Sequence, residues 1–399
     1  MALVFFYPQF KKLTGAERLI LRLAAYTARA PGSPPEVVLV THRLAEECRP
    51  ALDPEVQLVE TGWPMQVTGN HYLDAAVEYL LGPLLALRVP LRSLDGLVFF
   101  GPPSVPAMWF TRRVLLKLLR KKVPLLYFCF EPPRFIYSDT DDIVHRLGAF
   151  GPLLRPLFSL YRSLDRRMVS SAHQVLSNSP FGSERIRIAY GRRAVVIEHG
   201  VDLEPPRSGE VDALRARYGL NGRPAAVTVN HLHPRKRIDL FLKAVHHATR
   251  TGPAATAVVV GGGPEREQLE RHARALGMEP GKDVIFTGAV PDEEIAAHYG
   301  LGSVYVHTGR DESFGLSVIE ALKLGLPVVS VDEGGPRDTV QEGQSGHLTG
   351  ASPQQLGDAI ASLLSDPKRA RSMGAMGSRH ISSRYKWERG AATLLALLV

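Results

Sequence analysis

The chain has 399 residues, a length that suits two domains, each able to bury its own core. Its 45% hydrophobic and 22% charged residues are ordinary for a globular protein and exclude wholesale disorder. The formal charge of +8 is uneven, because residues 1–205 hold 25 Lys and Arg against 19 Asp and Glu, and this excess favours an anionic partner.

The two cysteines, Cys48 and Cys129, form neither a disulfide framework nor a CxxC metal pattern, so a reducing cytoplasmic location is expected. Residues 1–12 place their apolar run before their lysines, the reverse of a secretory signal. No uninterrupted apolar run reaches the length of about 18 residues that predicts a membrane span. No recognition motif accompanies the positive charge, so nucleic acid is not an expected partner.

Short apolar strands alternate with longer helical patterns, which is typical of parallel βαβ units. A loop rich in Pro and Gly at 201–210 interrupts this alternation. The pattern therefore predicts an α/β protein with two doubly wound Rossmann-like domains, which face each other across a cleft. Ligands of open parallel sheets bind beyond the carboxyl ends of the strands, so the site is expected in that cleft. The predicted strands are 2–7, 36–42, 96–101, 124–130, 173–179 and 194–200 in the first half, and 225–230, 256–263, 283–288, 303–308 and 327–331 in the second.

The segment 107–122, AMWFTRRVLLKLLRKK, predicts a helix with six cations and no acid. We expect its leucines to enter the core, because the segment lies between two predicted strands. We expect its cations to contact an anionic membrane surface, which would make the protein a peripheral one at the inner face of the membrane. An ordinary helix with solvated cations is the alternative.

The segment 138–142, SDTDD, contains a DxD pattern that holds Mn²⁺ in some transferases. It follows Pro-rich sequence and no clear strand end, so a solvated loop is the favoured interpretation and no metal site is predicted.

Two Gly-rich turns, at 14–24 and 258–270, lack the last glycine of GxGxxG, so a nicotinamide-binding interpretation is weak. Each turn does lead into a helix whose first amides could meet a phosphate, although a plain βα turn explains either one alone. The loop after the strand at 225–230 gathers cations that could neutralise a diphosphate. A solvated charge run is its alternative.

The segment 311–336, DESFGLSVIEALKLGLPVVSVDEGGP, predicts a helix that starts near Phe314–Gly315. Its amides could meet a phosphate, and Gly315 permits close approach of the backbone. Glu312, ahead of the helix, could accept hydrogen bonds from sugar hydroxyls. Glu320, just over one turn inside, could accept them from a ribose. Complementation of the helix dipole together with an incidental surface Glu is the alternative, which is adequate for Glu312 and explains Glu320 less well.

At this point the sequence resembles a known family. ESFGLSVIE at 312–320 is similar to the E-x7-E motif of retaining family-4 glycosyltransferases of the GT-B fold. GAERLILRLA, SNSPFGSERI, HGVD, GGGPEREQLE and GLPVVSVDEGGPRDTV also resemble its segments, in the family's order. The resemblance covers nearly the whole chain, and EPPRF with VNHLHPRKR is most similar to mannosyltransferases that build glycolipids and surface polysaccharides.

The resemblance implies a donor site for a nucleotide sugar and a role for each matching residue. Glu312 would contact the transferred sugar, Glu320 the ribose and Lys236 the phosphate, with Gly15 against the diphosphate and the base near 287–290. The complete set is Glu312, Lys236 and His231 as catalytic residues; Gly15, Asn230, Arg235, Arg237, Gly263, Thr287, Val290, Ser313, Phe314, Gly315, Leu316 and Glu320 as donor-binding residues; and Glu131 and Arg134 on the acceptor side.

Two positions depart from the family pattern. His231 stands where relatives usually have an arginine, and Arg235 or Arg237 could supply that charge. Phe130 stands where relatives often have a histidine that touches the donor sugar, and Glu131 or Arg134 could take part instead.

The sequence therefore predicts an acceptor domain at 1–204, a nucleotide-sugar domain at 205–380 and a C-terminal helix at 381–399 that returns to the first domain. The expected reaction transfers a hexose with retention, from GDP-mannose in preference to a UDP-sugar, to a lipid-linked or polysaccharide acceptor. The resemblance implies that no cofactor or metal is needed. A catalytically impaired nucleotide-sugar-binding protein and a GT-B phosphorylase or hydrolase are the alternatives.

Overall fold

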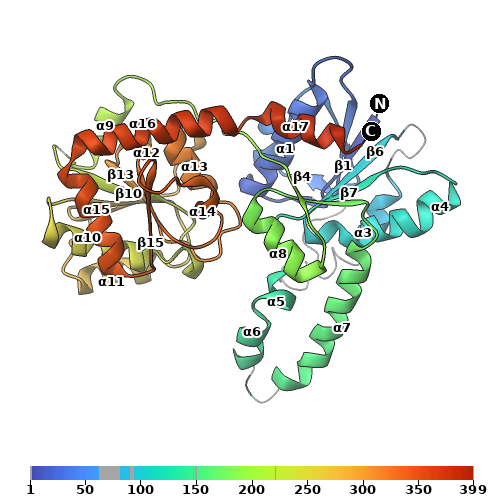
Figure 1. Ribbon diagram of the computed structural model, residues 1–399, viewed down its shortest axis with the longest axis horizontal. Helices are drawn as coiled ribbons and strands as arrows, with labels where there is room; N and C mark the ends of the chain where they lie inside the picture. Colours follow the sequence, from blue (N-terminus) through green and yellow to red (C-terminus); the bar gives the residue numbers. More distant parts are fainter. Residues whose placement is uncertain are drawn as a thin grey trace. The chain divides into compact units, whose positions relative to one another are not determined.

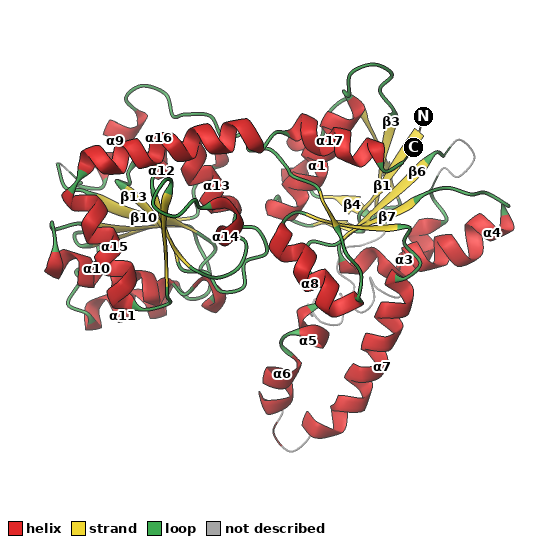
Figure 2. Cartoon of the chain, in the orientation of Figure 1, coloured by secondary structure: helices red, strands yellow, loops and turns green. Residues whose placement is uncertain are grey.

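The computed structural model describes residues 2–62, 81–89, 94–146, 148, 151–220 and 222–398, which form two compact units (Figure 1). Unit 1 comprises Met1–Gly200 and Lys386–Val399, and unit 2 comprises Val201–Tyr385. Each unit is a parallel sheet with helices packed on it (Figure 2). The sequence predicted the two domain boundaries at 204 and 380, whereas the units divide after Gly200 and after Tyr385.

The sheet of unit 1 has the strand order β5-β3-β1-β6-β7-β8-β9, and every pairing in it is parallel. Its inner strands β3, β1, β6, β7 and β8 are largely buried, as expected when helices cover a parallel sheet. The strands are β1 Ala2–Phe6, β3 Glu36–Thr41, β5 Val56–Glu60, β6 Gly96–Phe100, β7 Leu125–Phe128, β8 Gln174–Ser177 and β9 Val195–Val196; β2 Gln9–Phe10 and β4 Arg43–Leu44 form a separate pair.

The helices of unit 1 include a long α7, Gly151–Val169, and the C-terminal α17, Trp387–Ala396. Trp387 of α17 stacks on Tyr26 and His199, with ring centroids 6.1 and 5.5 Å apart. Further helices of unit 1 are α1 Gly15–Ala28, η1 Glu46–Ala51, η2 Pro102–Ser104, α3 Val105–Phe110, η3 Thr111–Leu115, α4 Leu116–Leu118, α5 Arg134–Tyr137, α6 Thr140–Arg146 and α8 Pro180–Tyr190.

Unit 2 has the strand order β12-β11-β10-β13-β14-β15, again wholly parallel. Its strands are β10 Ala225–Val229, β11 Thr256–Val260, β12 Val284–Gly288, β13 Val304–His307, β14 Val328–Val331 and β15 Gly346–Thr349. Its helices are α9 Glu210–Arg217, η5 Pro234–Lys236, α10 Ile238–Thr251, α11 Arg266–Ala275, α12 Asp292–Gly300, α13 Leu316–Lys323, α14 Pro336–Thr339, α15 Pro353–Ser365 and α16 Pro367–Arg384.

The helix expected at 107–122 is shorter than predicted. The helical run ends at Leu118, and Arg120 adopts a left-handed φ of 50°. The backbone amide of Lys121 then donates to the carbonyl of Leu116 at 2.9 Å, a closing bond typical of helix C-termini.

The expectation that the leucines of this helix enter the core is correct for only part of the set. Leu115 and Leu116 are buried, whereas Leu118 is 78% and Leu119 47% exposed.

The loop interpretation of 138–142 is wrong at its second half, because α6 begins at Thr140. Asp141 therefore lies in the first turn of a helix, where a carboxylate complements the helix dipole. Its Oδ1 also pairs with Arg155 at 3.3 Å.

Asp165 is fully buried in α7, where its Oδ2 accepts from the hydroxyl of Tyr137 at 3.0 Å. Burial raises its pKa to about 6. The unfolded chain ionises this group near pH 3.8, so between pH 4 and 6 the folded state holds the extra proton and stability falls as pH rises. We expect Asp165→Asn to gain stability over the native chain at pH 7.5, on the order of 2 kcal/mol, and to lose that gain near pH 4. Urea unfolding at both pH values measures this; a gain independent of pH would contradict it.

Candidate active site

The chain order of the strands in unit 2 reverses between β10 and β13. From β10 the chain proceeds outward through β11 and β12, and then returns to add β13, β14 and β15 on the other side. In doubly wound sheets the connections that leave two such strands diverge to opposite faces, and ligands bind at the carboxyl ends of those strands. The residues that follow β10 and β13 are the ones predicted to bind the donor.

Lys236 and Glu312 meet at this point. Lys236 ends the short helix η5 after β10, and Glu312 lies in the loop after β13. The Nζ of Lys236 donates to Oε2 of Glu312 at 2.5 Å, and both side chains are about three-quarters buried, with exposures of 25% and 28%. The sequence placed these residues 76 positions apart, and the fold makes them an ion pair at the strand ends.

Arg237 has a structural role beside this pair. Its backbone is left-handed, with a φ of 48°, and its guanidinium donates to the carbonyl of Thr308 at 2.6 Å. The same group binds both carboxylate oxygens of Glu333, at 3.2 and 2.9 Å. These bonds connect the loops after β10, β13 and β14, so Arg237 fixes the loop that carries Lys236.

The other predicted residues of the first loop lie at the end of β10. Asn230 is buried and its side-chain amide donates to Thr228 Oγ1 at 2.9 Å. His231 is exposed, and Arg235 is half-buried, with its carbonyl accepting from the amide of Arg310 at 2.8 Å. Of the two arginines considered as substitutes for the charge missing at position 231, Arg237 is paired with Glu333.

The Gly-rich turn after β11 packs directly on this loop. Gly261 has a φ of 126°, and a Cβ there would lie 2.0 Å from the carbonyl oxygen of Asn230. A Cβ at Gly263, with a φ of 155°, would lie 2.4 Å from the carbonyl oxygen of Leu232. These glycines are therefore required for backbone packing between the ends of β10 and β11, whether or not they also meet a ligand.

The N-terminus of α13 is formed by Gly315, whose φ is 87°. Phe314 is buried in the core, where its ring meets Tyr385 edge-on at 5.8 Å, so Phe314 offers only its backbone to a ligand. Ser313 and Leu316 flank it and are half-buried. Gly335 crosses over this turn, since a Cβ there would lie 2.5 Å from the Cα of Phe314. The packing thus holds the first amides of α13 in place.

Glu320 is oriented by a buried tyrosine that the sequence did not reveal. The hydroxyl of Tyr299, from α12, donates to Oε2 of Glu320 at 2.7 Å. Tyr305 of β13 donates to Ser317 Oγ at 2.7 Å in the same turn of α13. Both rings are fully buried. No spacing pattern joins Tyr299 to Glu320, because the two residues lie on different helices and the fold brings them together.

The segment predicted to receive the base lies at the end of β12. Thr287 is half-buried and its hydroxyl donates to the carbonyl of Gly288 at 2.8 Å. Val290 is half-buried against the apolar cluster on this side of the sheet. These two positions and the Gly261–Gly263 turn lie on neighbouring strands.

His307, the last residue of β13, is fully buried, and sequence reasoning did not select it. Burial is the largest reason that its pKa is lowered to about 4; Glu312 opposes this effect, and the nearby cations Lys236 and Arg237 add to it. It is therefore neutral at pH 7. A Cβ at Gly309 would lie 2.9 Å from its Nε2 and 3.4 Å from Oε2 of Glu312, so this ring and carboxylate flank the same glycine.

Unit 1 holds the remaining predicted residues. Gly15 begins α1, beside Glu17, whose carboxylate accepts from Tyr7 at 3.1 Å and from the hydroxyl of Thr14. Glu131 follows β7 and pairs with Arg134 at 2.5 Å and with Arg185 of α8 at 3.4 Å. The sequence did not identify Arg185 as a site residue, and the fold makes it the second cation that pairs with this carboxylate.

The described residues were compared with the requirements of a metal site and of a membrane-spanning helix. Within the ranges that the structure describes, no three His, Cys, Asp or Glu side chains are grouped to hold a metal ion. In the same part of the chain, no helix is long and apolar enough to cross a membrane.

Comparison with known proteins identifies the domain that contains this site. Residues 210–380, which include this site, match the family described as Glycosyl transferases group 1. A curated relative, the GDP-mannose-dependent alpha-(1-6)-phosphatidylinositol monomannoside mannosyltransferase of Mycolicibacterium smegmatis, is 34% identical over 250 residues. The match covers 59% of this chain and 65% of the relative, so the chain spans just under two thirds of that protein's length.

Solved structures extend the comparison to the whole fold. A sucrose-phosphate synthase from Thermosynechococcus elongatus superposes with a TM-score of 0.76 at 19% identity, covering 99% of this chain and 98% of its own. Anabaena HepE in complex with UDP and glucose gives 0.71 at 18% identity, with coverage of 99% and 98%. Together with the two parallel sheets, these similarities show the α/β GT-B fold that the sequence predicted.

Proposed function

We propose that this chain is a retaining glycosyltransferase that moves a hexose from a nucleotide diphosphate sugar to a lipid-linked or polysaccharide acceptor. The observation that supports it most is the Lys236–Glu312 pair at the strand-order reversal of a glycosyl transferases group 1 domain. GDP-mannose is the donor we favour, because the relative at 34% identity is named as GDP-mannose-dependent. A UDP-sugar is second.

In the proposed reaction, the bond between the anomeric carbon and the diphosphate breaks, and the acceptor oxygen bonds to that carbon on the same face. The departing phosphate oxygen takes the proton of the acceptor hydroxyl. Lys236 and the N-terminus of α13 stabilise the negative charge that grows on the diphosphate. Glu312 accepts hydrogen bonds from the sugar, and Glu320, oriented by Tyr299, accepts them from the ribose.

This proposal assigns stabilisation of the diphosphate to protein groups, and we propose that the chemistry needs no metal ion or other cofactor. Turnover that persists after treatment with EDTA would support this part. Loss of turnover that Mg²⁺ or Mn²⁺ restores would overturn it and leave the transfer reaction itself in place.

The donor assignment is tested by thermal unfolding with GDP, UDP, GDP-mannose and UDP-glucose. A ligand at 100 times its Kd stabilises the folded state by about 2.7 kcal/mol, so the correct nucleotide raises Tm clearly. We expect the guanine compounds to raise it more than the uracil compounds. If the donor binds but no nucleoside diphosphate is released in the presence of membrane lipid extracts, the catalytically impaired alternative is favoured. If nucleoside diphosphate is released with water as the only acceptor, a hydrolase is favoured.

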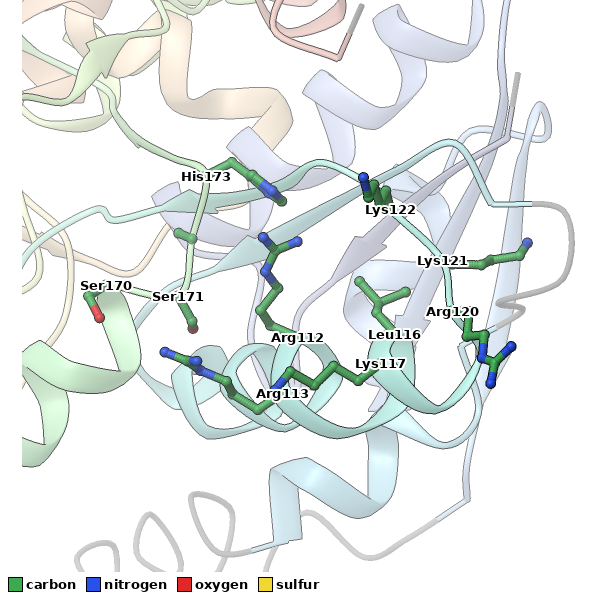
Figure 3. Close-up of a pocket in the computed structure, with 11 residues that line it drawn as sticks. Arg112, Arg113, Leu116, Lys117, Arg120, Lys121, Lys122, Ser170, Ser171 and His173 are labelled. Atoms are coloured by element: carbon green, nitrogen blue, oxygen red, sulfur yellow. The ribbon is translucent and has the colours of Figure 1, made fainter.

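We also propose that unit 1 docks on an anionic membrane through the cations of 107–122, which would place a lipid-linked acceptor beside the enzyme. These residues line a pocket of about 600 Å³ (Figure 3). Its lining residues are Arg112, Arg113, Leu116, Lys117, Arg120, Lys121, Lys122, Ser170, Ser171, Ala172 and His173, with no acid among them. Because Nδ1 of His173 accepts from the amide of Leu125, the pocket lies at the amino ends of β7 and β8. It is thus at the opposite edge of the sheet from the carboxyl ends.

Replacing Arg120, Lys121 and Lys122 together by Ser should weaken binding to vesicles of phosphatidylglycerol and phosphatidylcholine. Each cation near such a surface contributes about 1 kcal/mol, so we expect a loss of about a hundredfold at low salt and little loss at high salt. Cosedimentation measures it. The matched control replaces three exposed cations of α16, Lys368, Arg369 and Arg371, by Ser. Equal losses for both triple variants would contradict docking at this site.

A further inference from the structure

Exposed apolar side chains and positive charge are concentrated in the same unit. Of the 13 large hydrophobic side chains found exposed among the described residues, 12 lie in unit 1, and Met376 lies in unit 2. The sequence ranges of unit 1 hold 27 Lys and Arg against 18 Asp and Glu, a charge of +9, whereas unit 2 holds 21 against 22, a charge of −1. A surface that is both apolar and cationic fits an anionic lipid bilayer.

Four of these side chains form one stripe on α7. Leu153, Leu157, Leu160 and Leu164 are 74%, 61%, 57% and 48% exposed. Their spacing of four, three and four residues places them on one face of a helix, within about 60° of arc. Figure 2 shows α7 extending away from the sheet of unit 1, together with α5 and α6.

The face by which α7 packs on unit 1 is a different one. Asp165 and Val169 are buried, and helical spacing places both of them outside the arc that the four leucines occupy. Arg162 donates to the carbonyl of Ile136 at 2.8 Å, and Arg166 to that of Ala189 at 2.7 Å. These contacts hold the helix in place without the leucines, so the fold does not account for the stripe.

We propose that α7 is an interfacial helix whose leucine stripe inserts into an anionic bilayer. The proposal rests on the membrane docking proposed for the cation cluster at 107–122 and adds the apolar contact. The C-terminal end of α7 reaches the cationic pocket, because Ser170 and Ser171, which directly follow the helix, line it (Figure 3). A second copy of the chain is the less suitable occupant, since a stable protein interface buries about 800 Å² on each partner, more than four partly exposed leucines supply.

The test uses the whole chain and vesicles of phosphatidylglycerol and phosphatidylcholine. Leu157→Ser with Leu160→Ser should weaken vesicle binding about tenfold at low and at high salt, because loss of apolar contact does not depend on ionic screening. The matched control is Ile188→Ser with Met376→Ser, two exposed apolar residues outside α7. Unchanged binding by the α7 variant, or an equal loss in the control, would overturn the proposal.

A second readout locates the insertion. Leu160→Cys can be labelled with an environment-sensitive fluorophore, because Cys48 and Cys129 are both buried. A blue shift on adding anionic vesicles supports insertion, whereas a shift that depends on protein concentration without vesicles would show a dimer instead and overturn it. Neither readout needs a donor or an acceptor, so failure here leaves the transferase proposal intact, and failure of the nucleotide screen leaves this one intact.

Discussion

Lys236→Ala should lower kcat by about a hundredfold or more while weakening binding of the nucleoside diphosphate far less. The reason is that negative charge on the diphosphate grows as the sugar departs, so the ammonium group stabilises the transition state more than the bound donor. The structure places this group at the carboxyl end of β10, 2.5 Å from Glu312, with Arg237 fixing the loop that carries it. Turnover of the donor sugar and calorimetric titration with the diphosphate measure the two effects separately.

The matched control for this prediction is Lys243→Ala, which removes a lysine of α10 that pairs with Asp239 on the surface. It should leave both kcat and affinity unchanged. Because Lys236 and Glu312 are paired, Lys236→Ala could also release the carboxylate, so Glu312→Gln and the double variant complete a cycle. A Lys236→Ala protein with full turnover, or one whose loss lies entirely in donor affinity, would contradict the assigned role.

Glu320→Ala should weaken donor binding by about 10- to 150-fold, since a hydrogen bond to a charged group contributes about 1.5–3 kcal/mol. The fold should persist, because Glu320 is half-buried on α13 and its helix is held by buried neighbours such as Val318 and Ile319. Tyr299→Phe keeps the buried ring and removes only the hydroxyl that donates to Glu320. We expect it to weaken donor binding less than Glu320→Ala does, and to add nothing once Glu320 is absent.

Calorimetry with a ribose nucleotide and its 2′-deoxy analogue tests this assignment at the level of the sugar. The native protein should prefer the ribose form, and Glu320→Ala should lose most of that preference. If Glu320→Ala kept the preference for ribose, the carboxylate would not be the group that reads the hydroxyls. If Tyr299→Phe lowered donor affinity further in a protein that already carries Glu320→Ala, the tyrosine would act on the donor other than through Glu320.

The alternation of apolar strands and helical patterns was enough to predict two doubly wound α/β units, because a strand buried on both faces must be apolar throughout. The edge strands β5 and β15 escaped this reasoning. Only Val56 of β5 is fully buried, and in β15 only Gly346 is, so neither has the continuous apolar run of an inner strand. The segment 312–320 likewise predicted a helix with Glu312 ahead of it and Glu320 inside it, since both lie within one local element.

Contacts between elements required the tertiary structure. Lys236 reaches Glu312 because the sheet sets β10 beside β13, although β11 and β12 separate them in the chain. The hydroxyl of Tyr299 on α12 reaches Glu320 on α13, and Arg237 binds Glu333 across 96 positions. Only the tertiary structure shows that the leucine stripe of α7 is exposed, because a helix buried in the core has the same periodicity of leucines. A sequence records which side chains share a face, whereas the packing of the other elements decides whether that face is covered.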